Sequence, residues 1–381
     1  MSDVLRVTYQ LTCRPDEDPE DKARGIALEQ SAELPARCIP EHVYDQVVPT
    51  IECLEPLDSG AGRYRLVLDF PEAITGLEPT QLINNLFGNI SLKSGIRLDE
   101  VTWTPNLLRT LGGPRYGVDG VRELLGIGRR PMTSTALKPL GLDTATLAGF
   151  CADFARGGID LIKDDHGLCN QATSPFHERL LACQRAVNEA NAETGGHSLY
   201  LPNVTAPQGA LAERLDAAQE AGCRAVLICP FITGLDTLLW AREHYDMALM
   251  AHPAFAGAIA GAEHGIDPAL LLGEMTRLFG ADMVVYTNAE GRFPTYDQAL
   301  CDRINDRLWR PLGAAAAGES AIRPALPTPG GGVDAARAPY WAERYGPDVV
   351  LLIGGSLYAQ GDLVAAARRF QDVVERPEYA G

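Results

Sequence analysis

The chain has 381 residues, of which 46% are hydrophobic and 22% charged, and its formal net charge at pH 7 is −17. This length suits one large domain and one smaller domain with a sizeable core. The acidic charge argues against nucleic acid and anionic membranes as partners. It leaves room for a phosphorylated small molecule, because a local site can be positive or carry a metal.

The cysteines and the N-terminus indicate where the chain resides. Nine cysteines are scattered without a CxxC pair, and we expect buried thiols of the reducing cytoplasm, with no disulfides and no zinc cluster. No run of 18 apolar residues occurs, so no membrane association is expected. The first residues, MSDVLRVTYQ, lack the pattern of a secretory signal.

The first third of the chain predicts a small α+β domain. It contains the strand-like runs VLRVTYQL and YRLVLDF and helical stretches such as PTQLINNLFGN. A Gly/Pro-bearing stretch, LLRTLGGPRYGVDGVRELLG, follows and is interpreted as a connector. We therefore divide the chain into a smaller domain over residues 1–118 and a larger domain over residues 119–381.

From about residue 130, short apolar runs alternate with helical stretches. The strand candidates are MTSTALKP, GIDLIKDD, SLYLPNVT, CRAVLICPF, ALMAHPA, DMVVYTN, IRPALPTP and VVLLIGGSL, each followed by a plausible helix. Eight such repeats predict a parallel (β/α)8 barrel. The strands are almost continuously hydrophobic, as expected for burial on both faces. A doubly wound open sheet is the alternative fold.

In such a barrel, functional groups lie at the carboxyl ends of the strands. Lys163, Asp165 and His166 end the second predicted strand. Aspartate oxygen and histidine nitrogen are ligands for divalent cations, whereas a lysine ligates only after it has lost its proton and been modified. The spacing alone fits either a metal site or a surface charge cluster in which Lys163 pairs with a neighbour.

Glycines follow the last two predicted strands. Gly331 and Gly332 come after the seventh strand, and Gly354 and Gly355 after the eighth. Loops at these places in barrels often bind phosphate through backbone N–H groups, and glycine lets the backbone approach the anion closely. Two clusters on neighbouring strands favour a phosphate site over plain tight turns.

Other strand ends carry further polar candidates. Lys138 ends the first strand and is either a general base with a lowered pKa or a fixed positive charge for a phosphate. His252 ends the fifth strand, where a structural and a functional role are both open. Asn203 and Asn288 end the third and sixth strands, and we expect them to contact the substrate by hydrogen bonds.

These segments together resemble the RuBisCO large-chain family. GGIDLIKDDH is similar to the motif GGxDFxKDDE, whose lysine becomes a carbamate and binds magnesium with an Asp and a Glu. ALKPLGL resembles the IKPKLGLS segment that carries the catalytic base, and MAHPAFAG resembles HIHRAMHA. TNAEG resembles GKLEGE of the mobile loop after strand six. PGGGV and LIGGSL resemble the phosphate-binding turns SGG and FGGGT.

The resemblance extends into the N-terminal domain. FGNISLKSGIRLDEV and ALEQSAELP resemble segments that place Asn89 and Glu29 at active-site positions. In the family, these two residues reach the barrel mouth of the partner subunit. The resemblance therefore implies a homodimer or higher homo-oligomer. It also implies a phosphorylated small-molecule substrate and a bound Mg²⁺ (or Mn²⁺ or another divalent metal), with the ligand positions at Lys163, Asp165 and His166.

The departures from the family pattern concern the carboxylation chemistry. The lysine that contacts CO2 is replaced by Asn288, and the third metal-ligand position is His166 instead of Glu. Stabilising a forming carboxylate needs a positive charge beside it. LIKDDHGLCNQATSPF is close to the wording LIKDDxxxxxxxxTPF of the RuBisCO-like group. His166 is either a ligand, which suits zinc, manganese or iron better than magnesium, or a second acid/base.

The expected function is metal-dependent enolisation, of the tautomerase or isomerase type, of a phosphorylated ketose-like substrate without CO2 fixation. The catalytic candidates are Lys138, Lys163, His166 and His252. One alternative is a decarboxylase or carbon–carbon hydrolase of a phosphorylated 3-keto sugar acid. Another is a non-catalytic regulatory relative, against which the presence of Lys138, Lys163 and Asp165 argues.

Overall fold

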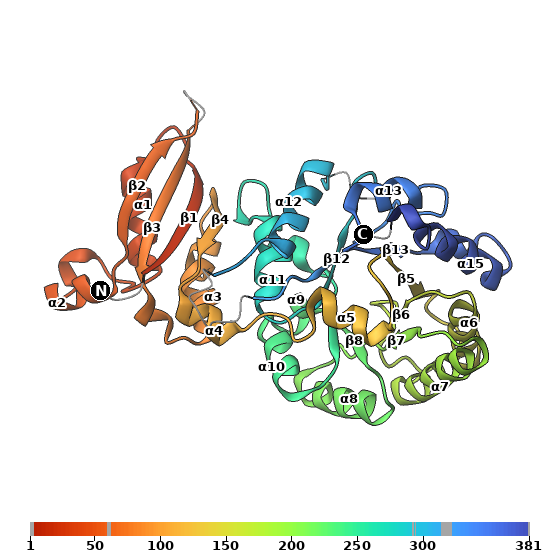
Figure 1. The fold of residues 1–381 in the computed structure, drawn as a ribbon. Coiled ribbons are helices and arrows are strands. Elements are labelled where there is room, and N and C mark those ends of the chain that lie inside the picture. The colour runs from red at the N-terminus through yellow and green to blue at the C-terminus, as the bar shows by residue number, and fades with distance from the viewer. Residues whose placement is uncertain (1–3, 59–61, 292, 294, 314–321, 380–381) are drawn as a thin grey trace. The chain divides into compact units, whose positions relative to one another are not determined.

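The computed structural model describes residues 4–58, 62–291, 293, 295–313 and 322–379 (Figure 1). By internal contacts the chain forms two compact units. The first unit comprises the chain up to Gly112 together with Phe255–Leu271 and Pro311–Ile322. The second comprises Gly113–Ala254, Leu272–Arg310 and the chain from Arg323 onward. The division into domains at residues 118 and 119 stays a prediction.

The first unit is built on a mixed five-stranded sheet. Its strands are β1 (Val4–Thr12), β2 (Thr50–Pro56), β3 (Arg63–Pro71), β4 (Ile96–Thr102) and β10 (Gly265–Ile266), in the order β10-β4-β1-β3-β2. β1 pairs antiparallel with β3 and β4, and its alternate residues Leu5, Val7, Tyr9 and Leu11 are fully buried. Its helices include α1 (Pro19–Glu29), α2 (Glu41–Val47), α3 (Pro79–Phe87) and α4 (Pro105–Leu111). The α+β prediction is confirmed.

The second unit is the predicted parallel barrel. Its strands are β5 (Met132–Leu137), β6 (Leu161–Asp164), β7 (Leu199–Leu201), β8 (Ala225–Ile228), β9 (Ala248–Ala251), β11 (Met283–Thr287), β12 (Leu326–Gly330) and β13 (Val350–Ile353). They pair in the order β7-β6-β5-β13-β12-β11-β9-β8, and a parallel bridge from Asn203 to Leu227 brings β7 to β8. All eight strand predictions are confirmed, and the doubly wound alternative is wrong.

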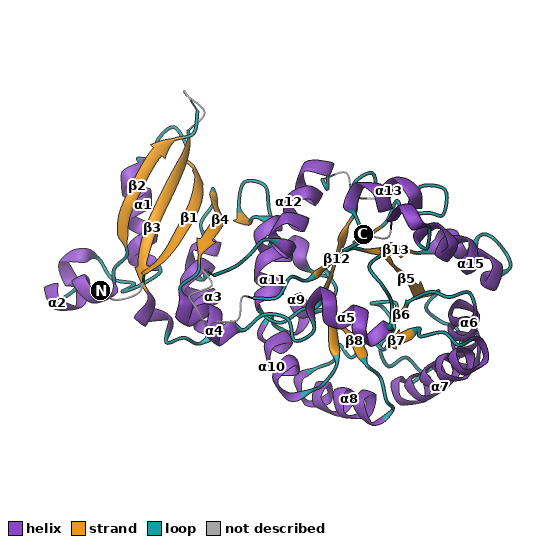
Figure 2. Cartoon of the chain, in the orientation of Figure 1, coloured by secondary structure: helices purple, strands orange, loops and turns teal. Residues whose placement is uncertain are grey.

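Helices surround the barrel strands (Figure 2). They are α6 (Thr144–Arg156), α7 (Phe176–Thr194), α8 (Gln208–Glu220), α9 (Pro230–Thr233), α10 (Asp236–His244), α12 (Gln298–Trp309), α13 (Ala338–Tyr345), α14 (Gly355–Tyr358) and α15 (Leu363–Val374). The connection from β9 to β11 departs from the expected single helix. It contains β10, a π-helical turn over Ala269–Met275 and the short α11 (Thr276–Leu278).

The stretch predicted as a connector includes the helix α5 (Gly117–Leu125). Val121 and Leu125 of this helix are buried in the same cluster as the barrel-interior residues Leu161 and Met283. The apolar face of α5 therefore fills the barrel end at which the strands begin. The opposite end, where the strands finish, remains for polar groups.

All nine cysteines are free. Cys151, Cys183, Cys223, Cys229 and Cys301 are buried as expected. Cys13, Cys53 and Cys169 are only partly buried, and Cys38, which ends the short 3-10 turn Ala36–Cys38 before α2, is exposed, so the expectation of burial is wrong for Cys38. None of the described helices combines the length and apolar character needed to span a membrane.

Candidate active site

The end of β6 directs alternate side chains to opposite sides of the barrel wall, as the period of a strand requires. Lys163 is 2% exposed, and its Nζ donates a hydrogen bond of 3.1 Å to the carbonyl oxygen of Asp164. Burial, opposed in part by the charge of Asp165, lowers the pKa of Lys163 to about 8. A neutral amine is therefore accessible near neutral pH.

Asp165 bonds to two other predicted site residues, Lys138 and His166. Its Oδ2 accepts a hydrogen bond of 2.8 Å from Lys138 Nζ, and its Oδ1 lies 3.1 Å from Nδ1 of His166. Burial alone would raise the pKa of Asp165. The bonds with His166 and Lys138 and the positive charge of Lys163 outweigh burial and hold that pKa well below its usual range. Because an ionised carboxylate only accepts, His166 donates from Nδ1 and presents Nε2.

His166 and His252 are brought together from two strand ends. Their rings stack with centroids 4.2 Å apart and planes inclined by 13°. The backbone N–H of Ala254 donates to Nδ1 of His252 at 3.1 Å, so the ring proton sits on Nε2. Burial, together with the charges of Lys163 and His166, lowers the pKa of His252 well below its usual value. His252 is therefore a neutral imidazole beside the lysines.

A buried ion pair between Asp164 and Arg179 lies behind the site. The sequence alone did not predict it. Asp164 Oδ2 accepts from Arg179 Nε at 3.1 Å, and Asp164 Oδ1 accepts from the hydroxyl of Tyr200 at 2.8 Å. Both charged side chains are fully buried. The remaining guanidinium nitrogens of Arg179 donate to the carbonyls of Ser174 and Cys169. Arg179 therefore fixes the segment between β6 and α7 that carries Asp165 and His166.

Asn203 is buried, and its amide bonds to the protein itself. Its Nδ2 donates to the carbonyls of His166 at 3.0 Å and Leu168 at 2.9 Å, and its Oδ1 accepts from the N–H of Thr205 at 3.2 Å. Asn203 thereby holds the backbone of His166 in place. Its expected contact with a substrate stays a prediction.

Asn288 directly follows β11, and its side chain contacts Tyr345 of α13. It is fully buried, and its Oδ1 accepts a hydrogen bond of 2.7 Å from the hydroxyl of Tyr345. Within the described part of the chain, Nδ2 of Asn288 is buried without a hydrogen-bond partner. The contact with a substrate that the sequence predicts stays a prediction, for which Nδ2 is the available donor.

The glycine turns leave open space at the strand ends. Gly331 and Gly332 have φ angles of +90° and +68°, which favour glycine. A Cβ atom at Gly331, Gly354 or Gly355 would meet nothing within 4 Å. Tyr358, which ends α14, accepts from the backbone N–H of Lys138 at 3.0 Å and ties the second turn to that residue. The turns and Lys138 follow neighbouring strands, with room for an anion.

Glu29 and Asn89 lie together in the first unit. Nδ2 of Asn89 donates to Glu29 Oε1 at 3.3 Å, and Nζ of Lys93 donates to Glu29 Oε2 at 2.9 Å. The hydrogen bond from Lys93 lowers the pKa of Glu29, although partial burial opposes it. The role of Glu29 and Asn89 at the barrel of a partner subunit stays a prediction.

Unmodified side chains do not form a complete metal site. In the described ranges, no three His, Cys, Asp or Glu side chains converge on one point. Asp165 offers a carboxylate oxygen and His166 offers Nε2, and a modified Lys163 would be a third protein ligand. The lowered pKa of Lys163 suits reaction of its amine with CO2, and the resulting carbamate would add an oxygen ligand. The donor types suit a divalent cation, but the carboxylate of Asp165 faces Nδ1 of His166, on the other side of the ring from Nε2, so the two side chains would have to separate before they could share one ion.

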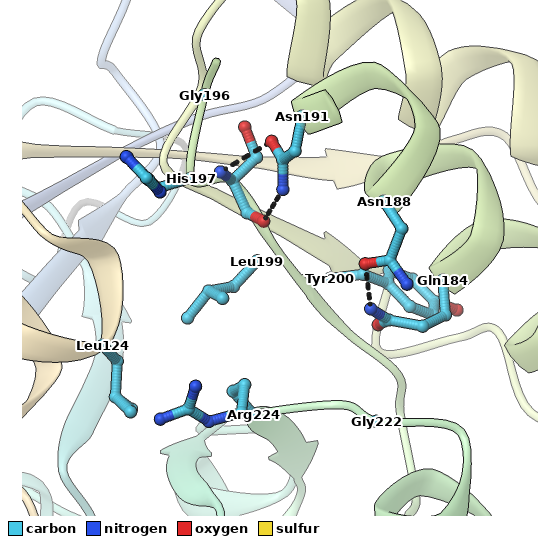
Figure 3. A pocket seen from close by; sticks show the side chains of 11 residues that line it. Leu124, Gln184, Asn188, Asn191, Gly196, His197, Leu199, Tyr200, Gly222 and Arg224 are labelled. Carbon is cyan, nitrogen blue, oxygen red and sulfur yellow. Dashed lines mark hydrogen bonds between the residues drawn. The ribbon is translucent and has the colours of Figure 1, made fainter. Parts of the chain in front are cut away.

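A separate hollow lies at the opposite end of the barrel, where β7 and β8 begin (Figure 3). Amide side chains of α7 line it together with His197 and Arg224. Asn191 exchanges two hydrogen bonds with the backbone of Ser198, and Gln184 donates to Asn188. These amides serve the packing of α7 on the strands, so this hollow is distinct from the candidate active site.

Comparison with known proteins shows the family to which this chain belongs. The family model for the ribulose bisphosphate carboxylase large chain, catalytic domain, matches residues 117–369. The chain is 39% identical over 376 residues to ribulose bisphosphate carboxylase-like protein 1 of Rhodopseudomonas palustris, covering 97% of each chain. It is 37% identical over 365 residues to 5-methylthioribulose-1-phosphate isomerase of Rhodospirillum rubrum, covering 95% of this chain and 93% of that protein. The crystal structure of a Rubisco-like protein from Rhodopseudomonas palustris superposes with a TM-score of 0.85 at 36% identity over 98% of both chains. The chain therefore belongs to the RuBisCO large-chain family, among whose members it is similar to the RuBisCO-like proteins.

Proposed function

We propose that this protein is a metal-dependent isomerase or enolase of a phosphorylated ketose-like substrate and that it does not fix CO2. The observation that carries the proposal is the cluster of Lys138, Lys163 and Asp165 beside open glycine turns. Asn288 stands where the carboxylases have a lysine, and its side chain is a neutral amide bonded to Tyr345. Named isomerases and named enolases both occur among the relatives of this chain.

The residues divide the work of binding and proton transfer. The backbone N–H groups of the turns at Gly331, Gly332, Gly354 and Gly355 would hold the phosphate. Lys138 would carry the proton between neighbouring carbons of the substrate, because its Nζ is held by Asp165 at 2.8 Å and its side chain is 38% exposed.

The two histidines would complete the site. Neutral His252 stacks on His166 and limits the positions that the His166 ring can take. A divalent cation, Mg²⁺ or Mn²⁺, held by carbamylated Lys163, Asp165 and His166 would polarise the substrate carbonyl and stabilise an enediolate. With an imidazole in place of a carboxylate, the ligand set is less committed to magnesium than that of the carboxylases.

The test uses 5-methylthioribulose 1-phosphate, the substrate class named for the isomerase relative, with bicarbonate and Mg²⁺ or Mn²⁺. We expect NMR to show proton exchange with solvent and product formation, both abolished by a chelator and restored by metal. Lys138→Met and Lys163→Met should each lower the rate by about 100-fold or more, the range for losing a positioned acid–base group. Lys22→Met, which removes a lysine of the first unit that bonds to Thr12 and Ser94, should retain the rate.

Three results would change the proposal. Incorporation of labelled CO2 into ribulose bisphosphate would show a carboxylase. Release of CO2 from a phosphorylated 3-keto sugar acid would identify the decarboxylase instead of the isomerase. Failure of every phosphorylated ketose, with no metal-dependent exchange, would leave the regulatory relative.

A further inference from the structure

An ion pair links the two loops that follow β11 and β12. The guanidinium nitrogen Nη2 of Arg337 lies 2.5 Å from Oε2 of Glu290. Glu290 belongs to the loop after β11 and has a φ of +58°, which is uncommon for a residue with a side chain. The Arg337 and Glu290 side chains are 33% and 66% exposed, so water and dissolved ions reach the pair.

Arg337 has supports at the glycine turn other than Glu290. Its guanidinium lies over the ring of Trp341, 5.0 Å from the ring centroid. Its Nη1 donates to the carbonyl of Gly332 at 3.5 Å. The indole N–H of Trp341 donates to the same carbonyl at 3.4 Å, and Trp341 is fully buried. A cation stacked on a fixed indole remains beside this turn when its carboxylate partner leaves.

The turn beside Arg337 is closed on one side and open on the other. A Cβ atom at Gly332 would lie 3.1 Å from the carbonyl oxygen of Glu290, so the two loops touch there. A Cβ atom at Gly331 would meet nothing within 4 Å. An anion can therefore reach the turn at Gly331, next to the guanidinium, without displacing the backbone.

We propose that Arg337 binds the phosphate of the substrate and exchanges Glu290 for it. This inference rests on the proposed function, which puts a phosphate at the glycine turns. An exposed ion pair is weak, whereas a phosphate dianion offers a guanidinium more charge and several acceptor oxygens. When Arg337 turns to the phosphate, the loop at Glu290 loses its tie to the start of α13, so occupancy of the phosphate site is transmitted to the loop after β11.

Titration with inorganic phosphate, followed by calorimetry at fixed ionic strength, tests the exchange. Arg337→Gln should weaken phosphate binding roughly ten-fold, as expected for the loss of a charge-assisted hydrogen bond. Glu290→Gln should strengthen phosphate binding several-fold, because the competing carboxylate is gone. The matched control is Arg344→Gln, on α13, the helix that begins directly after Arg337; the partner of Arg344 is Asp302 of α12. Phosphate binding should be unchanged in that variant.

The opposite signs separate a phosphate ligand from a structural tie. If Glu290→Gln leaves phosphate binding unchanged or weakens it, or if Arg337→Gln binds as well as the parent, the inference is wrong. In that case, weaker binding in Gly355→Val, which fills the neighbouring turn, would show that the proposed phosphate site stands without Arg337. A folded parent protein that binds no phosphate would overturn the inference and the proposed phosphate site together.

Discussion

Lys163 acquires its chemistry from where β6 ends. A lysine in water has a pKa of about 10.4, whereas burial at this position lowers the pKa of Lys163 to about 8. The side chain is enclosed, but its Nζ is directed to a backbone carbonyl and is not locked in a short ion pair. The neutral amine is the form that reacts with CO2, so pH controls whether the proposed carbamate forms.

Carbamate formation on Lys163 should increase with pH. Below its pKa the amine is protonated and unreactive, and roughly a tenth is neutral at pH 7 against half at pH 8. At a constant concentration of dissolved ¹³CO2, the carbamate signal in ¹³C NMR should therefore rise between pH 7 and pH 9. Lys163→Met should remove this signal, and Lys22→Met should retain it. A signal that persists in Lys163→Met would place the carbamate elsewhere.

The sequence pointed to candidate reactive residues, and the structure added residues that position them. Lys163 and Asp165 are two positions apart, so the alternation of a strand directs both toward the same side of the barrel wall. Asn288 and Asn203 were also expected to contact the substrate, which stays a prediction, and in the structure their amides bond to Tyr345 and to the backbone of His166. Which way a residue just beyond a strand turns depends on neighbours that only the folded chain supplies.

At the scale of elements, the segment between β6 and α7 depends on one buried arginine. Arg179 donates to Asp164 and to two carbonyls of the segment, and nothing of either charged side chain reaches solvent. An arginine on α7 is ordinary in a sequence, because most helix arginines are exposed. The pairing of Arg179 with Asp164 depends on the folded chain, in which Asp164 points outward from the barrel.

Removing Arg179 should destabilise the protein strongly. Arg179→Met leaves the Asp164 carboxylate buried without its cation, which costs about 3–5 kcal/mol in the free energy of unfolding. Arg185→Met, on the exposed face of the same helix, removes a loose pair with Glu189 at 3.9 Å and should change stability by less than about 0.5 kcal/mol. Urea denaturation of the parent protein and of the two variants measures both changes in stability. Equal stability of Arg179→Met and Arg185→Met would contradict this account.

At the scale of the whole molecule, we propose a homodimer or larger homo-oligomer in which Glu29 and Asn89 serve the barrel of the partner subunit. The two residues are hydrogen-bonded in the first unit, and Lys93 supports Glu29. Solved structures that are similar to this chain include an octameric and a dimeric Rubisco. The cytoplasmic location expected from the thiols also stays a prediction.

Mixing two inactive variants tests the shared site. Glu29→Gln and Lys163→Met should each be inactive alone. After subunit exchange, a mixed dimer would contain one intact site, so an equal mixture should recover about a quarter of the parent activity. Sedimentation should show a dimer or a larger species. Full activity in a sedimenting monomer, or no recovery in a mixture shown to exchange subunits, would contradict the proposal.

The sequence by itself determined the eight-stranded barrel, the α+β character of the first unit and the strand ends that carry the lysines, the aspartate and the glycines. Hydrophobic periodicity and turn residues are local, so these features can be read in order along the chain. Only the tertiary structure decided that α5 fills one end of the barrel and that residues 265–266 join the sheet of the first unit. It also decided that Arg179 backs the site and that Arg337 stands beside the glycine turn. Two of these contacts join segments far apart in sequence, whereas Arg179 and Arg337 meet partners 15 and five residues away. Burial and charge pairing select all of them only when the chain has folded.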